Sequence, residues 1–192
     1  MQKLLDIANI KAGHPFRGAV AENINGNARV IQIKNINEDG EVNWKGLIKT
    51  NLAGKNSPNW LQQDDVIFSA RGMKNIAAHI GELKHPTVCA QHYYVIQVKT
   101  EAILPEFLAW QLNQNPVQHY LKNYAQGSSQ LSIPKTLLGN APIYLPDKKR
   151  QKTIIELNKI VIKEKKVLNG LIDNRAKQLQ AIAQKILKNQ ET

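Results

Sequence analysis

The stretch from Asp147 to Lys188 constrains this chain more than any other part of its sequence. It contains no proline, and its apolar residues recur at steps of three, four or seven, which places them on one side of a helix. The members of this stripe are Ile154, Leu157, Val161, Leu168, Ile172, Leu179, Ile182 and Ile186. At 1.5 Å per residue such a helix extends roughly 60 Å, farther than a compact domain of this size is wide. The helix therefore needs a partner helix to bury its whole stripe.

We expect residues 147–192 to form a long coiled-coil helix that pairs two copies of the chain and spaces them. The predicted dimerisation residues are Leu157, Val161, Leu168, Ile172, Leu179, Ile182 and Ile186. Glu164, Lys165 and Arg175 lie on or beside the stripe, so the heptad pattern is not clean. Gly170 weakens the middle of the helix by about 1 kcal/mol relative to alanine. The alternative is a long exposed helix that frays at its end.

Length, composition and charge set the class of the remaining chain. The 192 residues allow one domain of ordinary size, residues 1–146, before the helix, and an apolar fraction of 42% supports a real core. The net charge is +11, and most of this excess lies in residues 147–192. A basic chain of this kind suits nucleic acid or an acidic protein surface.

The sequence also indicates a compartment. Cys89 is the only cysteine, so no intrachain disulfide forms, and a reducing, cytoplasmic location fits best. We expect neither a signal peptide nor a membrane span, because the chain has no run of about 18 apolar residues.

Short strands and helices alternate in residues 1–146, which predicts an α+β domain with a strongly curved sheet. Strands are expected at residues 28–33, 44–48, 66–70, 77–83, 88–98 and 141–146. One or two helices follow Leu104, with Asn115-Pro116 between them, because Pro105 suits a helix start. Residues 4–8 read as a short helix or strand, and residues 133–138 as a turn or short helix.

Three short patterns partly match known catalytic or metal-binding motifs, and none of the matches is complete. The run Ser57-Pro58-Asn59-Trp60 lacks the second proline of an amino-methyltransferase motif. The nuclease-like set of Pro146-Asp147 and Glu164-Lys165-Lys166 lies along one helix, which does not bring carboxylates together on a metal. His85, Cys89 and His92 have no second pair of ligands. The sequence therefore predicts a binding protein without catalytic or metal-binding residues.

Five short motifs in order resemble the specificity subunit of type I restriction-modification systems. They are Leu4-Leu5-Asp6-Ile7-Ala8 with Gly13 and Phe16, then Leu61 to Gly72, then Leu104 to Leu108, then Gln126 to Ser132, then Ile143 to Pro146 with Gln151 and Ile154. The resemblance covers one target-recognition domain and one conserved helix, as in the half-size specificity proteins, which pair up. The segment between Pro146 and Gln151 is basic and one residue longer than in the family pattern. The motif therefore does not fix the first residue of the helix.

The resemblance implies a sequence-specific DNA-binding protein that reads one half of a bipartite site. Catalysis is expected in a separate methyltransferase subunit, which binds S-adenosylmethionine, and the resemblance leaves room for a motor-nuclease subunit. The rival interpretation is a protein–protein adaptor whose basic helix docks on an acidic partner without any DNA contact.

Candidate DNA-binding residues lie mainly in two loops. Arg71 and Asn75 follow a rigid strand, and arginine pairs with guanine, and asparagine with adenine, through two hydrogen bonds each. The second loop supplies donors and acceptors for bases or phosphates. The full set is Arg71, Gly72, Lys74, Asn75, Gln126, Ser128, Ser129, Gln130 and Ser132, with Lys34, Asn35 and Lys135 as weaker candidates.

Overall fold

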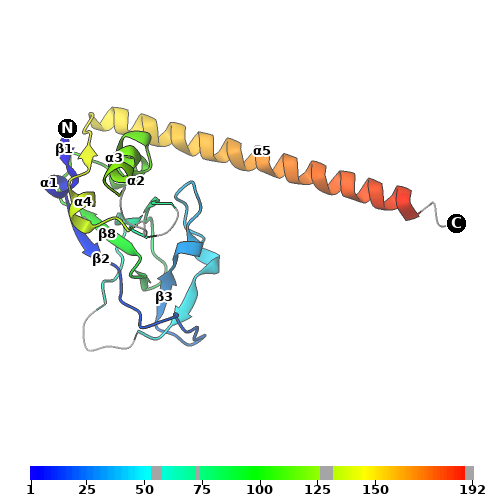
Figure 1. Cartoon of the computed structure of the whole chain (residues 1–192), viewed down its shortest axis with the longest axis horizontal. Helices are drawn as coiled ribbons and strands as arrows, with labels where there is room; N and C mark the ends of the chain where they lie inside the picture. The colour runs from blue at the N-terminus through cyan, green and yellow to red at the C-terminus, as the bar shows by residue number, and fades with distance from the viewer. Residues whose placement is uncertain (53–57, 72–73, 126–131, 189–192) are drawn as a thin grey trace. The chain divides into compact units, whose positions relative to one another are not determined.

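The computed structural model describes residues 1–52, 58–71, 74–125 and 132–188. The chain divides into two units, Met1–Lys152 and Thr153–Thr192. The first unit contains every strand of the described chain, and the second consists of most of one long helix (Figure 1). The expected α+β class, with a long C-terminal helix after a curved-sheet domain, is confirmed.

A four-stranded antiparallel sheet forms one half of the first unit. Its strands, in spatial order, are β2 (Ala8–Ala12), β8 (Tyr93–Val98), β5 (Val66–Ser69) and β6 (Ala77–His79). All four residues of β5 are buried, because this strand lies inside the sheet and is covered on both faces. The sequence expectation at residues 66–70 is confirmed, whereas the strand expected at residues 77–83 ends at His79.

A three-stranded mixed sheet forms the other half. Its strands, in spatial order, are β4 (Ile48–Thr50), β3 (Ala28–Ile31) and β7 (Thr87–Cys89). The strand β3 pairs antiparallel with β4 and parallel with β7. The segment after β3 coils into a 3₁₀ helix at Ile33–Asn35, and a second 3₁₀ helix spans Trp44–Gly46. The strand expected at residues 44–48 was therefore wrong, because Asn43 caps a helical turn there through its side chain.

The expected strand at residues 88–98 is in fact two strands in two different sheets. A tight turn separates β7 from β8, and the N–H of Tyr93 donates to the Ala90 carbonyl oxygen across it, at 3.0 Å. Gly13 lies against this turn so closely that a Cβ there would collide with the carbonyl oxygen of Ala90. The turn thus carries the chain from one sheet to the other.

The two sheets share one core. Ile31 and Cys89 of the three-stranded sheet pack in the same cluster as Ile67 and Val95 of the four-stranded sheet. Burial raises the pKa of the Cys89 thiol to about 12. The two separate sheets therefore pack around common apolar side chains.

Five α-helices complete the described chain. They are α1 (Leu4–Ile7), α2 (Pro105–Leu112), α3 (Asn115–Ala125), α4 (Lys135–Gly139) and the C-terminal α5 (Lys148–Lys188). The helix α2 packs on β5 and β6, and Asn113 at its end exchanges two hydrogen bonds with the backbone of Ala77. A two-stranded pair, β1 (Gln2–Lys3) with β9 (Pro142–Ile143), joins the first residues to the segment before α5. The strand expected at residues 141–146 is thus shorter than predicted.

Gln151, in the first turns of α5, is fully buried. Its side-chain oxygen accepts from the N–H of Leu104 at 2.8 Å, and its nitrogen donates to the carbonyl oxygens of Ala102 and Pro146 at 2.8 and 2.7 Å. Three backbone groups from two segments therefore depend on one amide. No helix in the described part of the chain is long and apolar enough to cross a membrane.

Candidate nucleic-acid interface

The end of β5 presents Arg71 on a fixed backbone. The N–H of Ala70 donates to the carbonyl oxygen of His92 at 2.8 Å, and the Ser69 hydroxyl donates to the carbonyl oxygen of Arg71 at 2.8 Å. The Arg71 side chain is exposed. A guanidinium that extends from a held backbone loses less conformational freedom when it binds than one on a free loop.

The structure brings the two predicted DNA-binding segments together. Arg71 and Ser132 form an antiparallel β-bridge, and the N–H of Ile133 donates to the carbonyl oxygen of Ala70 at 2.8 Å. The hydroxyl of Tyr94 on β8 donates to the Ile133 carbonyl oxygen at 3.1 Å. Ser132 is exposed, whereas Ile133 next to it is buried and anchors the segment in the domain. Two polar segments that lie far apart in the sequence are thus neighbours at the end of one strand.

Other predicted residues of these segments differ in what they offer. Lys135 is the first residue of α4 and is exposed. Lys74 is exposed but forms an ion pair with Glu38, which offsets its charge. The side-chain nitrogen of Asn75 donates to the carbonyl oxygen of Ser69 at 2.8 Å and so supports the loop. Gly72, Gln126, Ser128, Ser129 and Gln130 lie outside the described residues.

Asn35 does not fit a role in DNA contact. Its side chain is buried, its oxygen accepts from the N–H of Gln32 at 2.9 Å, and its nitrogen donates to the carbonyl oxygen of Gly46 at 2.9 Å. These bonds stabilise the 3₁₀ turn at Ile33–Asn35 and join it to the next one. The side chain of Asn35 thus serves the backbone of the turn rather than the solvent, which argues against the predicted DNA contact.

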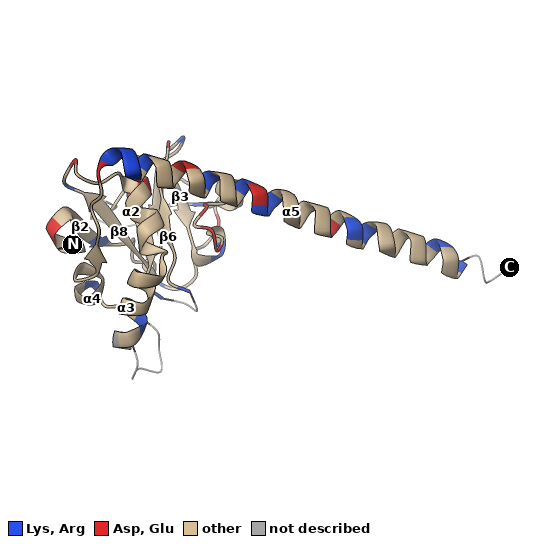
Figure 2. Ribbon diagram, turned by 90° about the horizontal axis from the view of Figure 1, so that it is seen from above, with Lys and Arg blue, Asp and Glu red and all other residues tan. Residues whose placement is uncertain are grey.

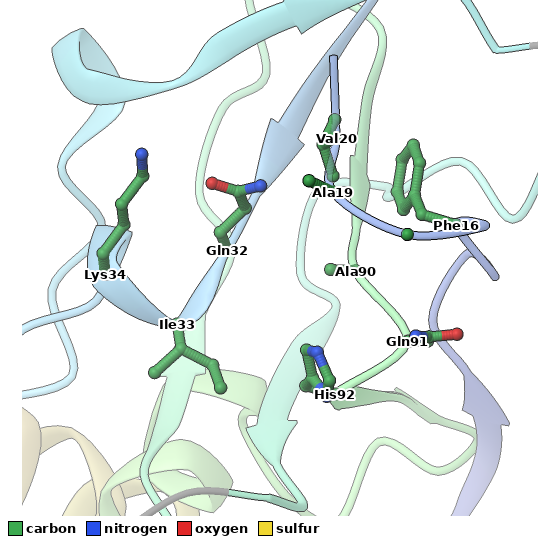
Figure 3. Close-up of a pocket in the computed structure, with 10 residues that line it drawn as sticks. Phe16, Ala19, Val20, Gln32, Ile33, Lys34, Ala90, Gln91 and His92 are labelled. Carbon is green, nitrogen blue, oxygen red and sulfur yellow. The ribbon is translucent and has the colours of Figure 1, made fainter. Parts of the chain in front are cut away.

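Lys34, by contrast, is exposed and lines a pocket of about 330 Å³ (Figure 3). Gln32, Gln91 and His92 contribute the other polar groups, and Phe16 contributes a ring from the segment after β2. The Nδ1 atom of His92 is buried and lacks a hydrogen-bond partner within the described parts of the chain. The carbonyl oxygen of His92 accepts a hydrogen bond from the N–H of Ala70, so this pocket adjoins the backbone that presents Arg71.

Most of these pocket residues were not predicted. Gln32 and Gln91 carried no recognisable signal, and His92 was considered only as a metal ligand. The residues come from three separate segments that the fold brings together, so periodicity within any one segment could not identify the pocket. In the described parts of the chain no three His, Cys, Asp or Glu side chains gather in a way that could hold a metal ion.

The predicted dimerisation residues lie on α5, and all of them are exposed in a single chain. Leu157, at 57%, is among the least exposed of the seven, and Leu179 is the most exposed, at 70%. Lysine and arginine residues are spread along the same helix (Figure 2). An exposed row of large apolar side chains on an otherwise charged helix is typical of a protein–protein contact.

Comparison with known proteins decides the family. The family model described as "Type I restriction modification DNA specificity domain" matches residues 1–178. The chain belongs to this family. Specificity domains of this family are generally non-catalytic, and their place in DNA restriction and modification agrees with the absence of a complete catalytic motif in the sequence.

Solved structures of type I restriction-modification proteins share the fold of this specificity domain. One comes from work on complex assembly and conformational transition of the type I system, with a TM-score of 0.57, 19% identity, and coverage of 96% of this chain and 45% of that chain. The HsdS subunit from Thermoanaerobacter tengcongensis has a TM-score of 0.55 and 16% identity over 84% of this chain and 36% of its own.

The S subunit from M. genitalium has a TM-score of 0.51 and 17% identity over 88% of this chain and 41% of its own. This specificity domain therefore spans less than half the length of each of these chains. A search of curated proteins found no match.

Proposed function

We propose that this specificity domain binds double-stranded DNA through the surface around Arg71 and Ser132 and reads one half of a bipartite site. The observation that carries the proposal is the bridge between these two residues, because it joins two exposed polar segments at the end of a buried strand. Arg71, Ser132 and Lys135 supply a guanidinium, a hydroxyl and an ammonium group, which suit guanine edges and phosphates.

Two copies of the chain pair through α5, so that a second recognition domain reads the other half-site. The exposed apolar face of α5 supports this pairing. The complex further includes a methyltransferase subunit, which binds S-adenosylmethionine and carries out the chemistry. A motor-nuclease subunit is compatible with this arrangement and is not needed for DNA recognition.

Substitution of Arg71 tests base reading. Once a preferred sequence has been selected from random duplexes, Arg71→Ala should lower affinity for it by about 1–3 kcal/mol and relax the preference at one base pair. Arg71→Lys is the matched control, because it keeps the charge but loses the two parallel hydrogen bonds to guanine. Binding is measured by fluorescence anisotropy with preferred and scrambled duplexes at several salt concentrations.

If Arg71→Lys behaves like the unchanged protein, Arg71 contacts phosphate and not a base. If the unchanged protein shows no salt-dependent affinity for any duplex, the adaptor interpretation replaces DNA binding, because phosphate contacts release counterions on binding.

The pairing through α5 predicts a palindromic target. A two-fold dimer presents two identical domains in inverted orientation, so the DNA must carry the same half-site twice, inverted, with unread bases between. Shortening α5 near Gln178 by one heptad, which is two helical turns, should change the number of unread bases and leave the half-sites unaltered. An asymmetric or continuous motif from the selection would indicate a second, different specificity chain.

A further inference from the structure

The pocket of about 330 Å³ has one polar side and one apolar side. Gln32 and Lys34 line the polar side, from the 3₁₀ helix that follows β3 and the residue before it. Phe16, Ala19 and Val20 line the apolar side, from the segment that follows β2 (Figure 3). A ligand in this pocket would therefore meet hydrogen-bonding groups on one side and an aromatic ring with methyl groups on the other.

The apolar side is held in place by a small core. Phe16 and Val20 pack against a cluster of buried side chains in the three-stranded sheet and the turn that follows it. That cluster consists of Val30, Val88 and Ala90. The ring of Phe16 also contacts the His14 ring edge-on, with the centroids 4.8 Å apart. A ligand would thus find a preformed surface and would lose little affinity to the ordering of this side.

The turn between β7 and β8 joins the pocket to the proposed DNA surface. His92 lines the pocket, and its carbonyl oxygen accepts from the N–H of Ala70 at 2.8 Å, next to Arg71. The Nδ1 atom of His92 is buried and lacks a hydrogen-bond partner within the described parts of the chain, which is costly for a polar atom. A ligand that bonds this imidazole would offset that cost.

A nucleobase matches this lining better than the other groups of DNA do. It is planar, so one of its faces can lie on Phe16, and its edge carries donors and acceptors that the Gln32 carboxamide can bond. None of the described residues around the pocket is acidic, and Lys34 can meet the phosphate of the same nucleotide. The volume is near the lower end of the range for ligand pockets, about 300–1,000 Å³, which suits a single ring system.

We propose that this pocket holds one nucleobase that leaves the duplex stack when the domain binds its half-site. The inference rests on the proposed DNA binding and adds the place where one further base is read. A base inside the duplex exposes only its edge in a groove, so its face reaches Phe16 only when it is unstacked. Neighbouring bases of a strand are about 3.4 Å apart, so a base close to the pair that Arg71 contacts can reach the pocket.

A mismatch scan tests the inference in the full-length protein. In a duplex selected from random sequences, each base of the half-site is kept while its partner on the other strand is replaced, one position at a time. Where the kept base enters the pocket, the mismatch should tighten binding about tenfold, because the base pair no longer has to be opened. At read positions inside the stack the same change should weaken binding. Fluorescence anisotropy measures both.

Fluorescent base analogues give an independent signal at the position that the scan identifies. Stacking in the duplex quenches 2-aminopurine, which replaces a purine, and pyrrolocytosine, which replaces a cytosine. Their emission should rise severalfold when the protein binds, because the base leaves the stack. If the base is thymine, its reactivity toward permanganate should rise instead. The same probes placed two positions away should change little.

Three variants connect these signals to the pocket. Ala19→Phe places a ring at an exposed position of the apolar side, so it should abolish both the gain from the mismatch and the rise in emission. Gln32→Ala should reduce discrimination between bases at the identified position by about fivefold or more, because the carboxamide no longer bonds the base edge. Ala102→Phe adds the same ring at an exposed position of the compact unit away from the pocket lining, and it should keep both signals.

The outcomes separate this inference from DNA binding itself. If the unchanged protein has no salt-dependent affinity for any duplex, DNA binding is wrong, and the base pocket with it. If it binds DNA but no mismatch tightens binding, or if Ala19→Phe keeps the rise in emission, DNA binding stands and the base pocket is wrong. Should Ala19→Phe lose all affinity for DNA, Gln32→Ala decides, because unchanged discrimination at the identified position would overturn the inference.

Discussion

The compact unit and the helical unit use apolar side chains in opposite ways. Phe68 and Leu108 in the compact unit are fully buried, whereas Leu168 and Leu179 on α5 are 59% and 70% exposed in a single chain. A buried side chain of this size stabilises the fold by about 1.5–3 kcal/mol relative to an exposed one. The compact unit therefore gains this stability within one chain, and α5 gains it only when a partner covers its face.

This difference assigns the two units separate roles. The fold of the compact unit fixes the backbone around Arg71, so the proposed DNA recognition there depends on the stable core behind it. The exposed face of α5 would be buried only in the proposed dimer, whose formation depends on protein concentration. Stability and assembly should consequently respond to separate substitutions.

The largest expected effect comes from a matched pair of core and helix substitutions. Phe68→Ala should lower the free energy of unfolding by about 3–5 kcal/mol, because Phe68 is fully buried in the compact unit and its loss leaves a cavity. Leu168→Ala should leave that value unchanged at concentrations where α5 is unpaired. Urea unfolding followed by tryptophan fluorescence measures this, since Trp44, Trp60 and Trp110 all lie in the compact unit. An equal loss from Leu168→Ala would mean that the two units unfold as one.

A smaller but more specific effect is expected at Gln151. Gln151→Ala leaves the N–H of Leu104 and the carbonyl oxygens of Ala102 and Pro146 without their partner. Because unsatisfied buried groups each cost about 1–3 kcal/mol, the total loss should be about 2–4 kcal/mol if water satisfies part of them. Gln178→Ala, on the exposed helix, is the control and should not change the tryptophan-detected unfolding. Equal behaviour of the two variants would show that the Gln151 amide is not needed to hold these segments.

Gln151 also illustrates what the sequence could and could not predict. The motif that ends in Gln151 helped to indicate the family, and the absence of proline with regular apolar spacing predicted α5. Gln151 joins three backbone groups, and two of them, at Leu104 and Ala102, lie almost fifty residues away in the sequence. Local periodicity contains no information on such distant partners.

Three features of the structure were not foreseen from the sequence, for related physical reasons. The turn between β7 and β8 lacks glycine and proline, so one continuous strand was expected across it. Asn35 is a polar residue in a turn, and such a residue can either contact solvent or bond the backbone. The sequence does not show that Asn35 makes backbone hydrogen bonds. Arg71 and Ser132 were predicted separately, and only the fold shows that they are adjacent.

The smallest expected effects come from one substitution placed in each unit. Gly13→Ala should destabilise the compact unit by about 1–3 kcal/mol, because the added Cβ meets the backbone of the turn between β7 and β8, which cannot move without disturbing both sheets. Gly170→Ala should instead stabilise α5 by about 1 kcal/mol, since alanine favours the helix and, apart from the adjacent helix backbone, no atom of the described chain lies within 4 Å of the added Cβ.

A glycine-to-alanine substitution is thus expected to destabilise the compact unit at Gly13 and to stabilise α5 at Gly170. Two spectroscopic signals measure these changes separately. Tryptophan fluorescence reports the loss at Gly13, and circular dichroism at 222 nm reports the gain of helix at Gly170, because α5 is the longest helix in the described chain. Gly81→Ala is the control for the compact unit, since no neighbouring atom lies within 4 Å of a Cβ there. If Gly13→Ala is as mild as Gly81→Ala, the turn yields, and the two sheets are less tightly joined than their shared core implies. If Gly170→Ala weakens dimerisation while it raises helix content, the middle of α5 must bend for two copies to meet.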